Sequence, residues 1–540
     1  MRIVTVEQMI QLEKEANSKG LGFAEMIHRA GIGLAEIIDN RFIRQKPNNI
    51  LGLVGPGNNG GDTLIALSEL KRFGWNTCAY LVRERKAGDL SLAEYAKTGG
   101  KIIPGKEDLN LKKLKTLISE SSILLDGILG TGFHLPLEGE IAMVLKAISI
   151  MDSLPVVIAV DCPSGVDCST GQASEESIPA DLTICMAAVK NGLLVLPAFK
   201  YVGEIAVCDI GLPADLIAWQ GLKDFMIDQD MVEKSLPHLA IDAHKGTLGT
   251  VMIIAGSTNY TGAPLLAGKA AYRTGAGLVR IAIPGSIYNA LAGHLPEATW
   301  LLLPHTAGVI NLEGVEIIRN NLKNISALLL GPGWGTEPAT ASFFQKLISG
   351  GKSSIRKQVG FISGFEKEYA DEGRLPNLVI DADSLKLLPH IPHWETLLSP
   401  DTILTPHPGE MAILSGLDIS TIQSSRINIA RDFAIQWQKI LVLKGALTVI
   451  ADPTGEVYIN PIATPALAHG GTGDVLAGMI TSLIGQGLKP INAAIVGCWI
   501  HAQAGLLAAK KVGDNVSVMA SDVIESIPCI YKELKENRLI

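Results

Sequence analysis

The sequence has no basic excess, no long apolar run and no paired-cysteine motif, and each absence excludes a class of protein. A net charge of −8 argues against a nucleic-acid-binding protein. No run of eighteen apolar residues occurs, and the opening MRIVTVE lacks a signal-peptide core. The 7 cysteines include no CxxC pair, so neither a disulfide framework nor a zinc site is indicated. We therefore expect a cytoplasmic protein without a membrane partner, and homo-oligomers are the general expectation for such proteins.

The chain of 540 residues is too long for one hydrophobic core, so more than one domain is expected. In the first half, apolar runs alternate with stretches of helical period such as 64–73, which predicts an α/β domain with a doubly wound, Rossmann-like sheet. A second α/β unit begins near residue 225 and runs to the end, with a polar surface excursion at 355–375. The predicted strands are 50–54, 77–82, 123–125, 155–160, 182–185, 250–255, 278–283, 327–330, 378–380, 402–404, 440–444 and 448–451, and the segment 203–213 closes the first unit.

The segment HGGTGDVLAG at 469–478 carries the clearest chemical signal. Its glycines let several backbone N–H groups point at one spot, and the helical spacing that follows places this turn at a helix N-terminus, which favours an anion. Asp474 is a carboxylate where a phosphate would be expected, which suits a base acting on an attacking hydroxyl. An N-cap Asp behind an ordinary glycine turn is the alternative. The complete run favours phosphoryl chemistry.

Three glycine-containing loops follow predicted strands in the first half, at 55–62, 126–133 and 161–167. The first, GPGNNGGD, stands between a buried strand and a helix, which suits a phosphate cradle, although Asn-Gly also forms simple turns. One Asp in such a loop is usually a cap, but three such loops indicate a shared site, with a monovalent or divalent cation. Lys190 ends a further strand and could supply a cation or a proton; taken alone it reads as a solvated loop lysine.

Together the motifs NNGGD, LLDGILGTGF, VDCPSGVD and VCDIGLP resemble the NAD(P)H-hydrate epimerase domain, here over residues 1–218. Pro56 and Thr63 replace two residues of the usual GNGNNGGDG loop and leave its amides intact. The resemblance implies a potassium ion near Asn59, Asp126 and Ser164, and an acid/base pair of Asp161 and Lys190 for epimerisation at C6 of the hydrated nicotinamide ring. It also implies a hydrate-binding set: Asn58, Asn59, Gly60, Gly61, Asp62, Gly130, Thr131, Gly132, Phe133, His134, Leu135, Pro136 and Asp161.

Further motifs of the second half suit a nucleotide and a metal. Lys444-Gly445 combines a phosphate-neutralising ammonium with close backbone approach, although a β-turn between two strands fits equally. Asp381 and Asp383 follow a predicted strand and could hold Mg²⁺ through water or cap a helix. His407 lies between prolines in a stiff loop, which favours a substrate contact over a mobile base, and a buried structural histidine remains an alternative.

GGTGDVLAG resembles the ribokinase-like superfamily. HKGTLG, YTGAPLLAGKAAYRTGAGLV, LLLGPGWG, DADSL, LTPHPGEM and VLKGALTVI, in order over 244–478, resemble the ADP-dependent NAD(P)H-hydrate dehydratase, here over 225–540. The resemblance implies a two-domain protein with a C-terminal ribokinase-like α/β domain. Its substrates would be NADHX and NADPHX, with K⁺ in the epimerase domain, Mg²⁺ in the dehydratase domain and ADP as co-substrate.

The implied dehydratase makes a good leaving group of the C6 hydroxyl by phosphorylating it, and ADP yields AMP and phosphate. Asp474 would deprotonate that hydroxyl of the S form, and the attached epimerase would make the R form repairable. The implied hydrate contacts are Ala263, Gly333, His407 and Asp474; the implied nucleotide contacts are Lys444, Gly445, Ala446, Leu447, Thr448, Gly471, Thr472 and Gly473.

One alternative is a ribokinase-like small-molecule kinase with a non-catalytic N-terminal binding domain. The DADSL and TPHPGEM segments argue against the kinase, and Asn59, Asp126, Asp161 and Lys190 argue for an active first domain. The sequence leaves open the choice of NADHX or NADPHX, of ADP or ATP, and whether the two sites communicate.

Overall fold

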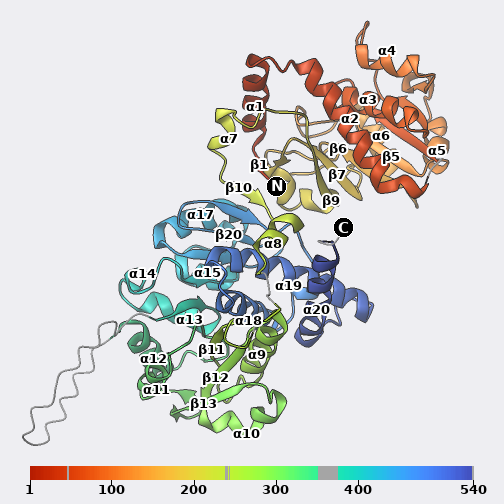
Figure 1. Cartoon of the computed structure of the whole chain (residues 1–540). Helices are drawn as coiled ribbons and strands as arrows, with labels where there is room; N and C mark the ends of the chain where they lie inside the picture. Colours follow the sequence, from red (N-terminus) through yellow and green to blue (C-terminus); the bar gives the residue numbers. More distant parts are fainter. Residues whose placement is uncertain (46–47, 238–240, 243, 351–374, 538–540) are drawn as a thin grey trace, which may run out of the picture. The chain divides into compact units, whose positions relative to one another are not determined.

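The computed structural model describes residues 1–45, 48–237, 241–242, 244–350 and 375–537, so nearly all of the predicted polar excursion at 355–375 lies outside the described residues. The chain divides into two compact units, Met1–Met226 and Ile227–Ile540 (Figure 1). Each unit has a hydrophobic core of its own. Both are α/β, as the alternation of apolar runs and helical stretches predicts.

The first unit is built on a parallel sheet with strand order β4-β3-β2-β5-β6-β7-β9. Buried apolar side chains of α1, α2 and α3 pack on one face of the sheet, and those of α5 and α6 pack on the other. A short parallel pair, β1 (Ile3–Val4) and β8 (Val189–Lys190), lies beside it. The strands are β2 (Asn49–Val54), β3 (Asn76–Leu81), β4 (Lys101–Pro104), β5 (Ile123–Gly127), β6 (Val156–Val160), β7 (Leu182–Met186) and β9 (Glu204–Cys208). The helices are α1 (Val6–Ser18), α2 (Phe23–Phe42), α3 (Asn58–Arg72), α4 (Leu90–Lys97), α5 (Lys112–Ser119), α6 (Gly139–Ser149) and α7 (Ile217–Gln220).

The second unit has a larger sheet, in which the strands follow the order β21-β20-β19-β18-β17-β16-β11-β12-β13. The pairs from β19 to β13 are parallel, and β20 is antiparallel to both β19 and β21. The strands are β11 (Thr250–Ile254), β12 (Leu278–Pro284), β13 (Thr299–Leu303), β16 (Ala327–Leu330), β17 (Asn377–Ile380), β18 (Ile403–Leu404), β19 (Ile440–Leu443), β20 (Val449–Ala451) and β21 (Val457–Ile459). Several of these strands end in the loops that carry the predicted site residues.

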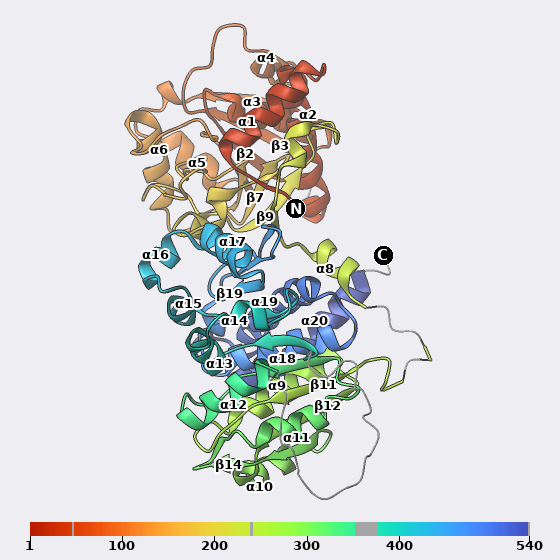
Figure 2. The same ribbon diagram turned by 90° about the vertical axis from the view of Figure 1, so that its left-hand side faces the viewer.

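Helices α9 (Gly262–Thr274), α18 (Thr472–Gly485), α19 (Pro490–Val512) and α20 (Ala520–Asn537) share one hydrophobic core with this sheet. The helices α11 (Gly314–Asn320), α12 (Pro338–Ile348), α13 (Asp383–Leu387), α15 (Pro408–Ser415) and α17 (Arg426–Trp437) lie on the other side (Figures 1 and 2). Of the described helices, α19 alone is long and apolar enough to cross a membrane. It is largely buried and packs between α18 and α20, as a core helix does.

Candidate functional site

The glycine-rich motif of the first unit is helical rather than a free loop. The sequence predicts a loop over 55–62, but α3 already begins at Asn58, so the amides and Asp62 belong to its first turns. A Cβ atom at Gly60 would lie 2.1 Å from the carbonyl oxygen of Gly55, so only glycine lets the helix start this close to the end of β2. The side chain of Arg85 ties this segment down by donating to the carbonyl oxygens of Gly55 and Gly57, at 2.5 and 3.0 Å.

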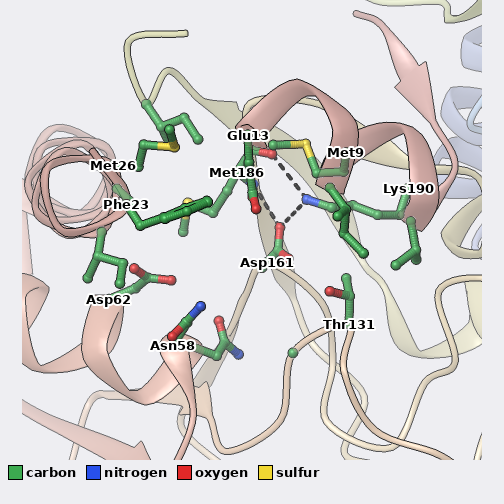
Figure 3. Close-up of a pocket in the computed structure, with 17 residues that line it drawn as sticks. Met9, Glu13, Phe23, Met26, Asn58, Asp62, Thr131, Asp161, Met186 and Lys190 are labelled. Carbon is green, nitrogen blue, oxygen red and sulfur yellow. Dashed lines mark hydrogen bonds and ion pairs between the residues drawn. The ribbon is translucent and has the colours of Figure 1, made fainter. Parts of the chain in front are cut away.

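A cavity of about 150 Å³ opens above this turn, between α1, α2, α3 and the carboxyl ends of the central strands (Figure 3). This volume is below the 300–1,000 Å³ typical of drug-sized ligands, so the cavity suits a single ring. The predicted residues that line it are Asn58, Asn59, Asp62, Gly130, Thr131, Asp161 and Lys190. Gly60 and Gly61 are buried and do not line it. The predicted residues Gly132, Phe133, His134, Leu135 and Pro136 do not line it either; they continue along the loop that follows β5.

Asp161 and Lys190 form an ion pair on the floor of this cavity (Figure 3). Lys190 is 1% exposed, and its Nζ also donates to the carbonyl oxygen of Met186 at 3.1 Å. Burial lowers the pKa of Lys190, but Asp161, together with the thiol groups of Cys185 and Cys168, outweighs burial, so the net shift is upward and the ammonium keeps its charge. Asp161 has a φ of +64°, and the backbone N–H of Met186 donates to its Oδ1 at 2.9 Å. A non-glycine residue held in this region indicates a functional constraint.

The three residues of the implied potassium site lie together. Ser164 donates from Oγ to Asp126 Oδ1 at 2.5 Å and from its backbone N–H to Oδ2 at 2.8 Å. Asn59 donates from Nδ2 to the carbonyl oxygen of Leu129, and the backbone N–H of Leu129 donates to Ser164 Oγ. Burial raises the pKa of Asp126. Asn59 Oδ1 is buried and has no hydrogen-bond partner among the described residues, so an oxygen ligand is free for a hard cation.

In the second unit, the HGGTGD segment forms a helix N-terminus, as the sequence predicts. Gly471, at φ +90°, precedes α18, and Asp474 is the third residue of that helix. The Nζ atom of Lys444, which follows β19, lies beside the same turn: a Cβ atom at Gly473 would be 3.4 Å from it. Backbone N–H groups, a helix dipole and an ammonium therefore converge on one place, which is an anion site.

Three carboxylates, those of Asp381, Glu410 and Asp474, act on the ammonium of Lys444. Its Nζ lies 2.7 Å from Asp381 Oδ1 and 3.8 Å from Glu410 Oε2. Burial and then the charge of Asp381 raise the pKa of Asp474 to about 7, while Lys444 lowers it and Asp383 and Glu410 raise it further. A carboxylate with this pKa can accept a proton near neutral pH.

His407 is the N-cap of α15. Its Nδ1 accepts from the backbone N–H groups of Gly409 and Glu410, at 3.0 and 3.2 Å, so the neutral ring carries its proton on Nε2. Burial and then Lys444 lower the pKa of His407. A neutral ring fixed in this way suits a contact and not a proton shuttle.

A cavity of about 370 Å³ joins these elements, with Lys444, Gly445, Ala446, Thr448, Thr472, Gly473 and His407 among its lining residues. The predicted residues that do not line it are Ala263, Gly333, Leu447, Gly471 and Asp474. Ala263 and Gly333 adjoin each other, since a Cβ at Gly333 would lie 3.0 Å from that of Ala263. Asn460 and His501 line the cavity and escaped the sequence analysis, because neither belongs to a motif. Asn460 Oδ1 and His501 Nε2 are buried without a hydrogen-bond partner among the described residues.

Asp383 does not face the cavity as a free ligand. Its Oδ2 accepts from the backbone N–H of Gly335 and its Oδ1 from Lys386, both at 2.9 Å. No group of three or more His, Cys, Asp or Glu side chains within the described ranges is arranged to hold a metal ion. A magnesium ion would therefore need ligands from a bound nucleotide.

Comparison with known proteins assigns both units. The family model of NAD(P)H-hydrate dehydratase matches residues 251–529, and that of the YjeF-related protein N-terminus matches residues 24–192. The bifunctional NAD(P)H-hydrate repair enzyme of Moorella thermoacetica is 35% identical over 99% of this chain and 98% of its own length, and that of Thermofilum pendens is 31% identical over 99% and 97%.

Among solved structures, the ADP/ATP-dependent NAD(P)H-hydrate dehydratase of Bacillus subtilis, co-crystallized with ATP/Mg²⁺, is 28% identical. The match covers 57% of this chain and 98% of that one, with a TM-score of 0.46. The whole-length relatives and the family model over half of the chain carry the assignment. The chain belongs to the bifunctional NAD(P)H-hydrate repair enzymes, which join an epimerase domain and a dehydratase domain in one polypeptide.

Proposed function

We propose that the cavity above α3 is the epimerase site and that the cavity at the N-terminus of α18 is the nucleotide site of the dehydratase. The epimerase domain spans residues 1–218 and the dehydratase domain residues 225–540. The substrates are NADHX and NADPHX, and the co-substrate is ADP. The net charge of −8 argues against a nucleic-acid partner, and we expect a cytoplasmic homo-oligomer without a membrane partner.

In the epimerase site, Asp161 moves the proton at the C6 oxygen of the hydrated ring, and Lys190 holds its carboxylate in place. The cavity is small and its walls include Met9, Phe23 and Met26, so the ring is held among apolar side chains. The buried, unpartnered Asn59 Oδ1 fits a potassium ion, which Asn59, Asp126 and Ser164 would hold. A bound cation there supplies positive charge for the substrate's phosphates.

In the dehydratase site, Asp474 takes the proton of the C6 hydroxyl as that oxygen attacks the terminal phosphate of ADP. The N–H groups of Gly471–Gly473 and the ammonium of Lys444 stabilise the charge on the phosphoryl group in transit. The ring nitrogen then expels phosphate from this ester as the C6–O bond breaks, and loss of a proton from C5 restores the C5=C6 double bond. Ala263, Gly333 and His407 contact the hydrate, and Leu447 supports the nucleotide loop.

Asp381 is paired with Lys444, and both oxygens of Asp383 accept hydrogen bonds, from Gly335 and Lys386. They would therefore act on a magnesium ion only through water, and the phosphates of the bound nucleotide would be its direct ligands. Magnesium supplies charge neutralisation at the phosphates. One observation carries the dehydratase assignment: Asp474, whose pKa is raised, is the third residue of α18 and lies near the ammonium of Lys444.

The test is recovery of absorbance at 340 nm when the protein, ADP and Mg²⁺ are added to mixed NADH-hydrate epimers. Recovery from both epimers is expected, Asp474→Ala abolishes it, and Asp161→Asn limits it to one epimer. A stable phosphorylated product without recovery would instead support the kinase. Recovery from one epimer by the unmodified chain would make the first unit a binding domain.

A further inference from the structure

The epimerase cavity holds a second carboxylate, Asp62 of α3, to which the reaction above gives no proton-transfer role. Asp62 is 7% exposed and lines the same cavity as Asp161. Its Oδ1 has no hydrogen-bond partner among the described residues. Figure 3 shows the two carboxylates entering the cavity from different elements, Asp62 from α3 and Asp161 from the loop after β6. A buried carboxyl oxygen without a protein partner is costly unless a ligand or a proton satisfies it.

The surroundings of Asp62 favour the neutral acid. Burial, and then the charges of Asp161 and Glu13, raise the pKa of Asp62 well above its ordinary value. Lys190 and Arg85 act in the opposite direction, but Lys190 is committed to Asp161 and Arg85 to Asp89. The titratable groups that face Asp62 are Glu13 of α1, Arg85 after β3, Asp161 after β6, Lys190 of β8 and the thiol of Cys208 at the end of β9. Asp161 is paired with the ammonium of Lys190, whereas Asp62 Oδ1 has no hydrogen-bond partner among the described residues, so the two carboxyl groups of this cavity have the contrasting environments of a base and an acid.

Lys190 is a poor candidate for the acid. It is fully buried, it pairs with Asp161, and the Asp161 charge raises its pKa above the ordinary lysine value. An ammonium in this state gives up a proton less readily than free lysine. Its contacts make it the positioning residue of Asp161.

We propose that neutral Asp62 is the acid of the epimerase and that Asp161 is the base, an inference that rests on the proposed assignment of this cavity. Asp62 donates its proton to the C6 hydroxyl, the C6–O bond breaks and water leaves. The lone pair of the ring nitrogen forms a C6=N1 double bond. Water then adds to the other face of C6, Asp161 takes the proton of that water, and the nitrogen regains its lone pair. Exchange with solvent restores both carboxyl groups.

The experiment compares full-length Asp62→Asn, Asp161→Asn and Glu69→Gln, each combined with Asp474→Ala so that no epimer is consumed. Glu69 is a carboxylate of α3 that pairs with Arg72 and does not line the cavity, so it is the matched control. Conversion of one purified NADH-hydrate epimer into the other is followed by chromatography. We expect Asp62→Asn to lower kcat by about 10²–10⁴-fold with KM little changed. When Asp62 is intact, kcat should fall as the pH rises and Asp62 loses its proton. In Asp62→Asn, kcat should not show this fall.

Three outcomes separate the possibilities. Asp62→Asn with an unchanged kcat, or with a raised KM alone, would overturn the proposal while leaving Asp161 as the epimerase residue. If Asp161→Asn also kept full activity, the cavity itself would not be the epimerase site. Circular dichroism of each variant reports on folding, so a loss of kcat in a folded Asp62→Asn protein supports the proposal.

Discussion

Lys444 Nζ lies 2.7 Å from Asp381 Oδ1, although 63 residues separate them in the chain. Thr405 Oγ1 donates to the same carboxylate oxygen at 2.7 Å. This pair brings the end of β17 and the end of β19 to the first turn of α18. The ammonium of Lys444 therefore compensates the negative charge of several carboxylates and lies beside the turn where a phosphate would bind.

Dehydratase activity should fall as the solution becomes acidic, with a midpoint near the Asp474 pKa of about 7. The base must be ionised to take a proton, so kcat/KM rises with pH through that value. Asp474→Asn should lower kcat by at least about 10²-fold. A pH profile of kcat/KM on the S epimer measures this. An unchanged rate in Asp474→Asn would contradict the role of the base.

Lys444→Met should move the acidic limb of that profile to higher pH. Lys444 lowers the pKa of Asp474, so its removal lets burial and Asp381 raise that pKa further. KM for ADP should also rise, because a phosphate partner is lost. Lys269→Met, an exposed lysine of α9, is the control and should leave the profile unchanged. If the acidic limb of the kcat/KM profile lay at the same pH in Lys444→Met as in the unmodified chain, Lys444 would not act on Asp474.

Asn59→Ala should weaken potassium binding by the first unit. The substitution removes Oδ1, the buried oxygen that lacks a partner among the described residues. Thermal unfolding measured in KCl and in choline chloride should show stabilisation by K⁺ in the unmodified chain and less in Asn59→Ala. Asn49→Ala, which loses only a surface contact to the Glu120 carbonyl, should respond as the unmodified chain does. Equal stabilisation in Asn59→Ala would exclude this site.

Lys190→Met should destabilise the first unit by about 3–5 kcal/mol, the usual cost of leaving one partner of a buried ion pair alone. The double variant Lys190→Met/Asp161→Asn should recover part of that loss, because the uncompensated charge is gone. Urea unfolding of the unmodified chain, of Lys190→Met and Asp161→Asn singly, and of the double variant gives the coupling energy. Additive effects would mean that the two side chains do not interact.

Asp62→Asn should stabilise the first unit at neutral pH while it slows the epimerase. An unfolded Asp loses its proton near pH 4, whereas folded Asp62 keeps its proton to higher pH. Between those two values the folded state binds more protons, so stability falls as pH rises, and an amide removes that fall. Thermal midpoints measured from pH 4 to 8 should diverge in favour of Asp62→Asn. Parallel curves would show that Asp62 is not protonated in the folded state.

The sequence predicted both α/β units and most of the central strands, because buried parallel strands are continuous apolar runs. Among the strands that it missed are β4, β13 and β21, where burial is partial or the strand is only three residues long. It placed Asn58–Asp62 in a loop, since glycines and asparagines disfavour helices in general. Here Gly60 allows close packing on Gly55, and tertiary contact overrides propensity.

In the two candidate sites, the residues that the sequence predicted are those that belong to short local motifs. Glu13 and His501 escaped because they lie on the ordinary helices α1 and α19, and Asn460 escaped because it follows β21 outside any recognisable motif. No local pattern distinguishes a helix residue that lines a cavity from one that faces solvent. The resemblance, by contrast, implied Asp161 and Lys190 as an acid/base pair, and the two side chains are in contact as an ion pair.

Because each unit has its own hydrophobic core, the two activities can be supplied by different molecules. A mixture of a chain carrying Asp161→Asn with one carrying Asp474→Ala would then repair both epimers by complementation in solution. Comparing the repair rate of the mixture with that of the unmodified chain, at equal concentration of each site, would show whether joining the two sites in one chain makes repair faster.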